Sequence, residues 1–342
     1  MKYFIPFCFF VMTVSIIQCA DNEDRNQNPD KNNDNPEITS GFEGFYFVAR
    51  YNGKEAVYFY NADDKTSKVF WTDKREDVIE LSYSPDKNVI FFLTARNYGK
   101  KGALPFVRKS KLYRLDPKTK NTEFLKETGS GIQIYTSWET DNNFKIIINS
   151  VDPVIATYIN QNTLLLNQFG KTLKDEIKIF DLTREGYPKL PAPEIALTSP
   201  EGNFTFVRSQ KDSALIQIRG KDGRLIPVIK TFQNINKILW TEEDSLMIFT
   251  TLDLPEELKS VKAGKTETSN LVIFSVLDTS VVKIWRGDGL KRFLLFDKML
   301  VFDDGFGVNS VIRIFDLTKR IVSDEIRIKG GCGLKNIPKL IF

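Results

Sequence analysis

Histidine is absent from the 342 residues of this chain, and only three cysteines occur. Without histidine, the commonest general base and the commonest metal ligand of proteins are both excluded. Cys8 and Cys19 lie in or beside an N-terminal apolar stretch, so the rest of the chain holds only Cys332. A single cysteine can form neither an internal disulfide nor a cysteine-based zinc site. We therefore expect no metal and no cofactor, and interpret Cys332 as a small buried apolar side chain.

Catalytic signatures are missing as well. The sequence has no Ser-His-Asp set, no nucleophile elbow, no phosphate-cradling glycine loop and no cluster of metal ligands. Carboxylates are common, but their spacing does not reveal whether two of them converge as the pair of a glycosidase does. We expect a protein that is not an enzyme and has no catalytic residues. An enzyme that acts on glycans through unrecognised carboxylates is the less favoured alternative.

Helical periodicity is also lacking, because no stretch shows a capped pattern of apolar residues with a helical repeat. Phenylalanine, by contrast, is frequent at 27 residues, and β-branched residues abound. Aromatic and β-branched side chains fit the pleated, half-buried surface of strands. The composition therefore predicts an all-β fold.

The N-terminus combines a leader with a modification site. Residues 1–17 place one lysine before an apolar run that is too short to cross a bilayer comfortably, as in a signal peptide. The sequence IIQCA, which contains Cys19, resembles the lipobox of bacterial lipoproteins, whose cysteine is lipidated and becomes the mature N-terminus. Gln18 stands where a small residue is usual, as in the relaxed lipoboxes of spirochaetal lipoproteins. Cleavage after Ala20 and an uncleaved N-terminal strand are the weaker alternatives.

The next segment predicts a flexible tether. Residues 20–40 hold six acidic and two basic residues and almost no apolar ones, so they bury too little surface to offset their ordering entropy. We therefore divide the chain into a signal peptide at 1–18, a lipidated tether at 19–40 and a folded part at 41–342. The whole chain carries a formal net charge of +4, and the folded part is more basic still. This balance suits an acidic partner, such as an anionic glycan or a lipid headgroup, and is far from a nucleic-acid signature.

A strand followed by a tight turn recurs along the folded part. The six copies begin at Ala56, Lys111, Glu176, Ala214, Leu271 and Val311. Each copy is flanked by further strands, and the spacing is near that of propeller blades. We predict a six-bladed β-propeller of four-stranded antiparallel blades. The first unit lacks its innermost strand, and residues 334–342 are expected to supply it and to close the ring. The fourth strand of the third unit is placed near Leu190.

One unit carries a family resemblance. Residues 82–96 read SYSPDKNVIFFLTAR, and residues 111–125 read KLYRLDPKTKNTEFL. This resembles the WD40-like repeat of TolB-type β-propellers, in which Ser-Pro-Asp-Gly precedes a strand and Leu-Tyr-x-x-Asp comes after it. Lys87 replaces the usual glycine, and residues 199–202 form a weaker second copy. The resemblance implies a propeller and leaves the activity open, although it suggests a periplasmic envelope scaffold as an alternative function.

Three long connections are expected on one face of the propeller, at residues 95–110, 151–175 and 252–270, and binding residues concentrate on such loops. The first connection supplies our ligand-binding candidates. They are Arg96, Tyr98, Lys100, Lys101, Arg108 and Lys109. A solvated basic loop is the alternative interpretation.

Arg286 and Asp288 are two further ligand-binding candidates, because with Gly287 they match the integrin-recognition triplet. They are placed in a loop between the fifth and sixth units, where an ordinary turn is the alternative interpretation. Altogether, the sequence predicts a monomeric lipoprotein of a bacterial outer membrane that binds a protein or an anionic glycan. Which side of that membrane it occupies is left open.

Overall fold

The computed structural model describes residues 42–96, 107–139, 141–188, 197–212, 214–230, 234–253, 268–288, 292–304, 309–329 and 334. All of them belong to one compact unit, Ser40–Phe342. The leader, Cys19 and the predicted tether lie outside the described residues.

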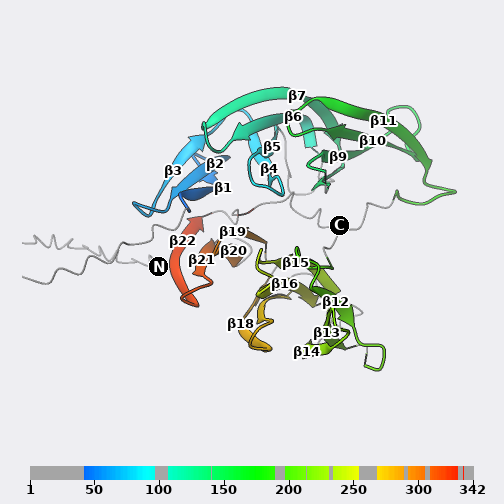
Figure 1. The fold of residues 1–342 in the computed structure, drawn as a ribbon. Coiled ribbons are helices and arrows are strands. Elements are labelled where there is room, and N and C mark those ends of the chain that lie inside the picture. The colour runs from blue at the N-terminus through cyan, green and yellow to red at the C-terminus, as the bar shows by residue number, and fades with distance from the viewer. Residues whose placement is uncertain are drawn as a thin grey trace, which may run out of the picture. The chain divides into compact units, whose positions relative to one another are not determined.

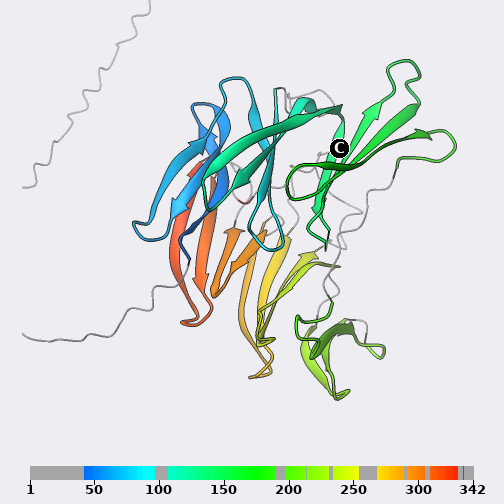
Figure 2. The ribbon, with the colours of Figure 1, turned by 45° about the horizontal axis from the view of Figure 1, so that its top comes forward.

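Every regular element in the described ranges is a β-strand, which confirms the all-β prediction. The strands form six antiparallel sheets in which neighbours in the chain are neighbours in the sheet (Figures 1 and 2). The first sheet contains β1 (Gly44–Tyr51), β2 (Lys54–Asn61) and β3 (Thr66–Trp71). The second contains β4 (Asp77–Tyr83), β5 (Ile90–Ala95), β6 (Val107–Asp116) and β7 (Asn121–Gly131). The third contains β8 (Gln133–Trp138), β9 (Phe144–Val151), β10 (Tyr158–Leu166) and β11 (Thr172–Asp181).

The remaining three sheets repeat this pattern. The fourth contains β12 (Phe204–Arg208), β13 (Leu215–Gly220) and β14 (Leu225–Lys230). The fifth contains β15 (Asn234–Trp240), β16 (Leu246–Asp253), β17 (Thr268–Ser275) and β18 (Ser280–Asp288). The sixth contains β19 (Phe293–Phe296), β20 (Met299–Asp304), β21 (Asn309–Asp316) and β22 (Ile321–Lys329). An isolated antiparallel bridge also pairs Thr198 with Thr205 of β12.

The Ser-Pro-Asp turn of the repeat has a clear physical basis. Between β4 and β5, the Ser84 hydroxyl donates to Asp86 Oδ1 at 2.6 Å and accepts from the Val89 amide at 3.0 Å. Lys87 comes next with a φ of 58°, in the left-handed region where glycine is favoured. Glycine adopts this backbone conformation at lower cost than lysine, which accounts for glycine as the usual residue at this position of the turn.

Buried apolar clusters connect the sheets in a defined order. One cluster joins the first, second and sixth sheets and includes Val48, Phe92 and Ile314. A second joins the second and third sheets through Phe91 and Phe144. Two further clusters join the fourth sheet to the fifth, and the fifth to the sixth. No apolar cluster of the described residues joins the third sheet to the fourth, so the packing order runs four, five, six, one, two, three.

A polar contact also links the first sheet to the last. The Tyr60 hydroxyl, on β2, donates to the carboxylate of Asp324 on β22. Burial, and then this hydrogen bond, raise the pKa of Tyr60 above its ordinary value. The two ends of the described chain are therefore held together by polar as well as apolar contacts.

Tyr60→Phe should lower the free energy of unfolding by about 1–2 kcal/mol, because a partly buried carboxylate loses its donor. Tyr58→Phe is the matched control, since the Tyr58 hydroxyl makes only an exposed 3.3 Å bond to the Arg50 carbonyl. Urea unfolding of both variants measures the difference, and equal losses would contradict a structural role for the Tyr60–Asp324 bond.

The third sheet corrects one part of the sequence prediction. Residues 151–175 are not a long loop, because they contain β10 and the first residues of β11. The repeat copy that begins at Glu176 is the outer strand β11 rather than the third strand, and the fourth strand expected near Leu190 lies outside the described residues. A third strand would lie inside the sheet, whereas the side chains of Ile177 and Ile179 are 64% and 60% exposed. The sequence pattern is the same for an inner and an outer strand. The position of a strand in its sheet depends on the strands with which it pairs.

The expected closing strand at 334–342 lies outside the described residues except for Leu334. The Leu334 side chain is buried in the cluster of the first, second and sixth sheets. Its carbonyl accepts a hydrogen bond from Arg292 Nη1 at 3.4 Å. The first sheet has three strands in the described part of the chain, as the prediction of a missing inner strand requires.

Candidate functional site

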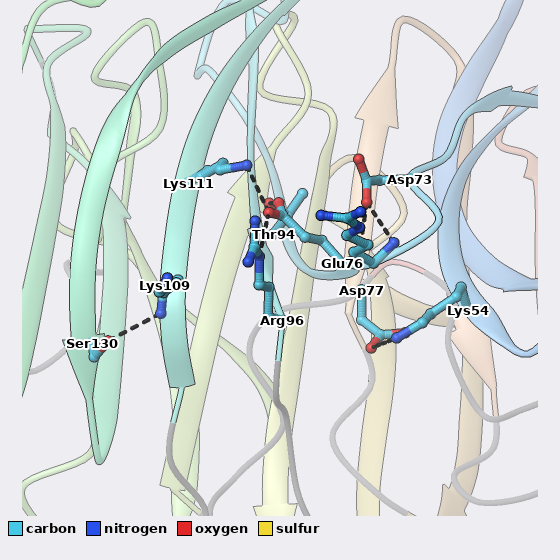
Figure 3. Close-up of polar contacts among 10 residues, drawn as sticks. Lys54, Asp73, Glu76, Asp77, Thr94, Arg96, Lys109, Lys111 and Ser130 are labelled. Atoms are coloured by element: carbon cyan, nitrogen blue, oxygen red, sulfur yellow. Dashed lines mark hydrogen bonds and ion pairs between the residues drawn. The ribbon is translucent and has the colours of Figure 1, made fainter.

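A buried carboxylate lies beside the predicted basic loop. Glu76 directly precedes β4, and only 1% of the residue is exposed. The turn before it is fixed by Asp73, whose Oδ1 accepts the amides of Arg75 at 2.6 Å and Glu76 at 3.0 Å. Such a local side-chain-to-backbone turn is typical of Asp. It directs the Glu76 side chain toward Thr94 near the end of β5 and toward Lys111 within β6 (Figure 3).

Three groups converge on the Glu76 carboxylate. The Thr94 hydroxyl of β5 donates to Oε2 at 2.6 Å. Lys111 Nζ of β6 lies 2.7 Å from Oε1, and Arg96 Nε lies 3.6 Å from the same oxygen. The hydrogen bond to Glu76 raises the pKa of Lys111 above its ordinary value. Glu76 therefore neutralises part of the basic cluster that the sequence groups together, and it holds Arg96 and Lys111 in place.

The neighbouring Asp77 ties this region to the first sheet. Its carboxylate lies 3.1 Å from Lys54 Nζ and accepts the Glu55 amide at 3.0 Å (Figure 3). Both partners begin β2. Asp77 thus connects the second sheet, which carries the Glu76 cluster, to the start of β2 in the first sheet. These contacts give the site a rigid geometry.

A β-bulge at the start of β6 exposes two consecutive cations. The pairing of β6 with β7 shifts register between Val107 and Ser110, and Lys109 has a φ of 51°. The Lys109 amide donates to Ser130 Oγ at 3.0 Å, while the buried Ser110 hydroxyl lies 2.6 Å from that of Thr128. Bulges interrupt the alternation of side chains and re-aim them. Arg108 and Lys109 are consequently both exposed, whereas a regular strand would bury one of them.

The predicted ligand-binding residues of the first connection therefore divide into three groups. Arg108 and Lys109 are exposed and have no ion-pair partner among the described residues. Arg96 is paired with Glu76, and its amide donates to the Arg108 carbonyl at 3.2 Å. Tyr98, Lys100 and Lys101 lie outside the described residues. Two of the three expected loops, at 95–110 and 252–270, also lie largely outside them.

The Arg286–Asp288 triplet is in a strand and not in the loop that we expected. It forms the end of β18, where Arg286 pairs with Asn270 and Asp288 with Thr268 of β17. Strand pairing holds this backbone extended, so these three residues form no turn. The connection between the fifth and sixth sheets begins only after Asp288, so the loop was predicted three residues too early.

Sequence reasoning missed Glu76. Its signal was the charged run 73–77 in the connection between the first two sheets, but spacing alone does not show which charge is buried. The bulge at Lys109 was missed as well, because no glycine marks its positive φ. Both features depend on contacts between segments that are distant in the sequence.

Lys237 is a second unusual cation. Its Nζ donates to the Phe293 carbonyl at 2.9 Å and lies 4.8 Å from the centre of the Phe293 ring. Burial lowers the pKa of Lys237 to about 8, and the positive charge of Lys87 adds to this decrease. Lys87 belongs to the turn between β4 and β5, and Lys237 to β15, so two separate sheets contribute to one electrostatic environment.

Lys87→Met should raise the pKa of Lys237, because removing the second positive charge makes protonation less costly. The remaining decrease, which arises from burial, should persist. Carbon-13 NMR titration of lysine Cε measures this change, and Lys118→Met, in an exposed turn, is the control. A Lys237 pKa that stays the same in both variants would contradict the coupling.

No group of three or more Cys, Asp or Glu side chains in the described residues could hold a metal ion. The buried Asp303 carboxylate accepts the Arg292 amide at 2.7 Å, so this carboxylate has a structural partner. Within the same residues, no helix is long and apolar enough to cross a membrane.

Comparison with known proteins gives loose structural matches. No protein-family model matches the sequence, and no curated protein matches it. Among solved structures, TolB from Acinetobacter baumannii is 12% identical with a TM-score of 0.41, covering 84% of this chain and 65% of that one. A periplasmic gluconolactonase from Pseudomonas aeruginosa is 12% identical with a TM-score of 0.44, covering 86% and 99%. A chain of a nidogen/laminin complex is 11% identical with a TM-score of 0.38, covering 83% and 92%.

Proposed function

We propose that this chain is a lipid-anchored β-propeller of a bacterial cell envelope that binds an acidic glycan or protein. In this proposal the six sheets are blades, residues 334–342 close the ring, and Cys19 carries the lipid. Arg108 and Lys109, with Lys100 and Lys101, form the ligand-binding face.

The observation that carries the binding proposal is the bulge in β6. It directs two consecutive cations into solvent, while the adjacent Arg96 and Lys111 are both paired with Glu76. Exposed cations on a rigid framework attract an anionic ligand without a large cost of ordering. The basic balance of the folded part favours the same class of ligand.

Two observations support the propeller. The packing order of the sheets places the last sheet against the first, which a ring of blades requires. Leu334, the residue with which the proposed closing strand begins, is buried in that junction beside the three-stranded first sheet. Closure by an added strand would leave no exposed inner edge there.

A glycan and protein array tests the binding proposal. We expect the full chain to bind sulfated or carboxylated ligands, and the variant with Lys100, Lys101, Arg108 and Lys109 all changed to alanine to lose them. Selective binding of neutral ligands that is unchanged in the variant would exclude the basic face as the ligand-binding site.

The anchor has an independent test. Metabolic labelling with a palmitate analogue should label the exported chain and should fail for Cys19→Ala. A label that persists in the variant would exclude Cys19 as the lipidation site. Protease treatment of intact cells then separates a surface-exposed binding protein from a periplasmic scaffold, because only the former would be digested.

An enzyme acting on glycans remains a less favoured function. The carboxylate of Asp303, one of the buried acids, accepts a hydrogen bond from the backbone amide of Arg292. This carboxylate therefore has a structural role that explains its burial without catalysis. Release of reducing sugar from an array ligand by the purified chain would favour the enzyme over the binding module.

A further inference from the structure

The outer strand of the third sheet has an unpaired and partly apolar edge. β11 pairs only with β10 among the described strands (Figure 1). Ile177 is 64% exposed and Ile179 is 60% exposed. Near the start of the strand, Lys126 of β7 lies 3.3 Å from Thr172 Oγ1 and 4.0 Å from Asp175 Oδ2. The second half of β11 has no such neighbour in the described part of the chain.

The pairing of β11 with β10 determines which backbone groups of β11 point away from the sheet. The Leu182 amide donates to the Thr157 carbonyl at 2.9 Å, in the same register that pairs Glu176 with Thr163. Residues opposite each other alternate between hydrogen-bonded and non-hydrogen-bonded pairs in an antiparallel sheet. Even-numbered residues of β11 therefore bond to β10, and the amides and carbonyls of Ile177 and Ile179 point away from the sheet.

Positive and negative charges alternate at Lys174, Glu176 and Lys178 of β11, so the strand is complementary in charge to a second, antiparallel copy of itself. Glu176 Oε2 lies 2.7 Å from Lys174 Nζ, and Glu176 Oε1 lies 3.9 Å from Lys178 Nζ. Lysines on an edge strand usually deter pairing with another strand. Here a carboxylate lies between two of them, so a strand of reversed direction can place each Glu176 opposite a Lys178.

We infer that two copies of this chain associate through antiparallel pairing of β11 with β11, with Ile177 on the two-fold axis. Only odd-numbered residues have outward backbone groups, so they must lie opposite each other. A centre at Asp175, Glu176 or Lys178 would set a like charge opposite itself. A centre at Ile177 sets Glu176 opposite Lys178 on both sides of the axis.

This register also brings the exposed isoleucines of the two copies together. Ile177 of one copy lies opposite Ile177 of the other, and each Ile179 lies diagonally next to the opposing Ile177. These four side chains lie on one face of the joined sheets, and the Glu176–Lys178 pairs lie on the other. A centre at Ile179 leaves Lys178 opposite Phe180 and loses both charge pairs. This two-fold association replaces the monomer expected from the sequence.

Sedimentation of the purified full chain in mild detergent over a range of concentrations tests the inference. We expect a reversible monomer–dimer equilibrium, because a single strand edge buries less area than a standard stable interface. Ile177→Lys should weaken the dimer by at least about tenfold, since it sets two cations opposite each other on the axis. Leu225→Lys, at a similarly exposed site on the outer strand β14, should leave it unchanged.

A charge exchange tests the register itself. Glu176→Lys alone and Lys178→Glu alone should each sediment as monomers, because like charges then face each other. An equimolar mixture of these two variants should restore the dimer, since each Lys faces a Glu of the other variant. A monomer at every concentration of the wild type, or a mixture that stays monomeric while the wild type dimerises, would overturn the inference.

Discussion

Replacing Glu76 with glutamine is expected to lower the free energy of unfolding by about 2–4 kcal/mol. The substitution leaves Lys111 and Arg96 without their shared anion. Removing one partner of a buried ion pair costs about 3–5 kcal/mol when the remaining charge is fully buried. Lys111 and Arg96 keep 22% and 40% of their side chains exposed, so solvent offsets part of this cost.

The pH dependence of the same variant provides a second readout. The Glu76 hydrogen bond raises the pKa of Lys111 above its ordinary value of 10.5. The stability from this contact is fully present below pH 10.5 and is lost as the pH rises through the raised value. The wild type should therefore lose stability in that alkaline range more steeply than Glu76→Gln. Glu123→Gln, on an exposed position of β7, is the control, and a Glu76→Gln loss no larger than that of the control would contradict a structural role for Glu76.

Phe92→Ala is expected to cost still more, about 3–5 kcal/mol, because it opens a cavity in the core. The Phe92 ring is fully buried and stacks on Tyr113 at 5.0 Å with an interplanar angle of 7°. Trp71 of the first sheet packs edge-on against it, also at 5.0 Å. Phe92 therefore joins two sheets through aromatic contacts, which add to the energy of burial.

Phe124→Ala is the matched control for this prediction. Phe124 contacts the same Tyr113 ring at 5.6 Å, but half of the residue is exposed. Chemical unfolding should show a loss below about 1 kcal/mol for Phe124→Ala, because little area leaves water. Equal losses in the two variants would contradict the assignment of Phe92 to the junction between the first two sheets.

The sequence was sufficient for most strands because each unit repeats one pattern. A strand, a tight turn with Asp or Gly and a further strand recur, and the apolar alternation marks the buried face. The strand order of the third sheet was not predicted correctly, because β11 has the apolar alternation of an inner strand although Ile177 and Ile179 are exposed. A repeat pattern reports that a segment is a strand, whereas its place in the sheet depends on which strand it pairs with.

The candidate site was predictable only in part. The cations near Arg108 could be found by composition, since the loop holds no acid between residues 96 and 111. The pairing of Arg96 and Lys111 with Glu76 could not, because it brings together residues from three separate parts of the sequence. The exposure of both Arg108 and Lys109 depends on a β-bulge, and the sequence has no glycine there that would indicate one.

The measurement that tests the central claim most directly is binding to heparin, a sulfated polysaccharide, at several salt concentrations. The double variant Arg108→Ala/Lys109→Ala is compared with the wild type and with Lys118→Ala/Lys221→Ala, which removes two exposed lysines elsewhere. We predict about tenfold weaker binding and a smaller salt dependence for the first variant, because two charge contacts are lost. The control should match the wild type. Equal affinity and equal salt dependence for all three proteins would contradict the basic face of β6 as the ligand-binding site.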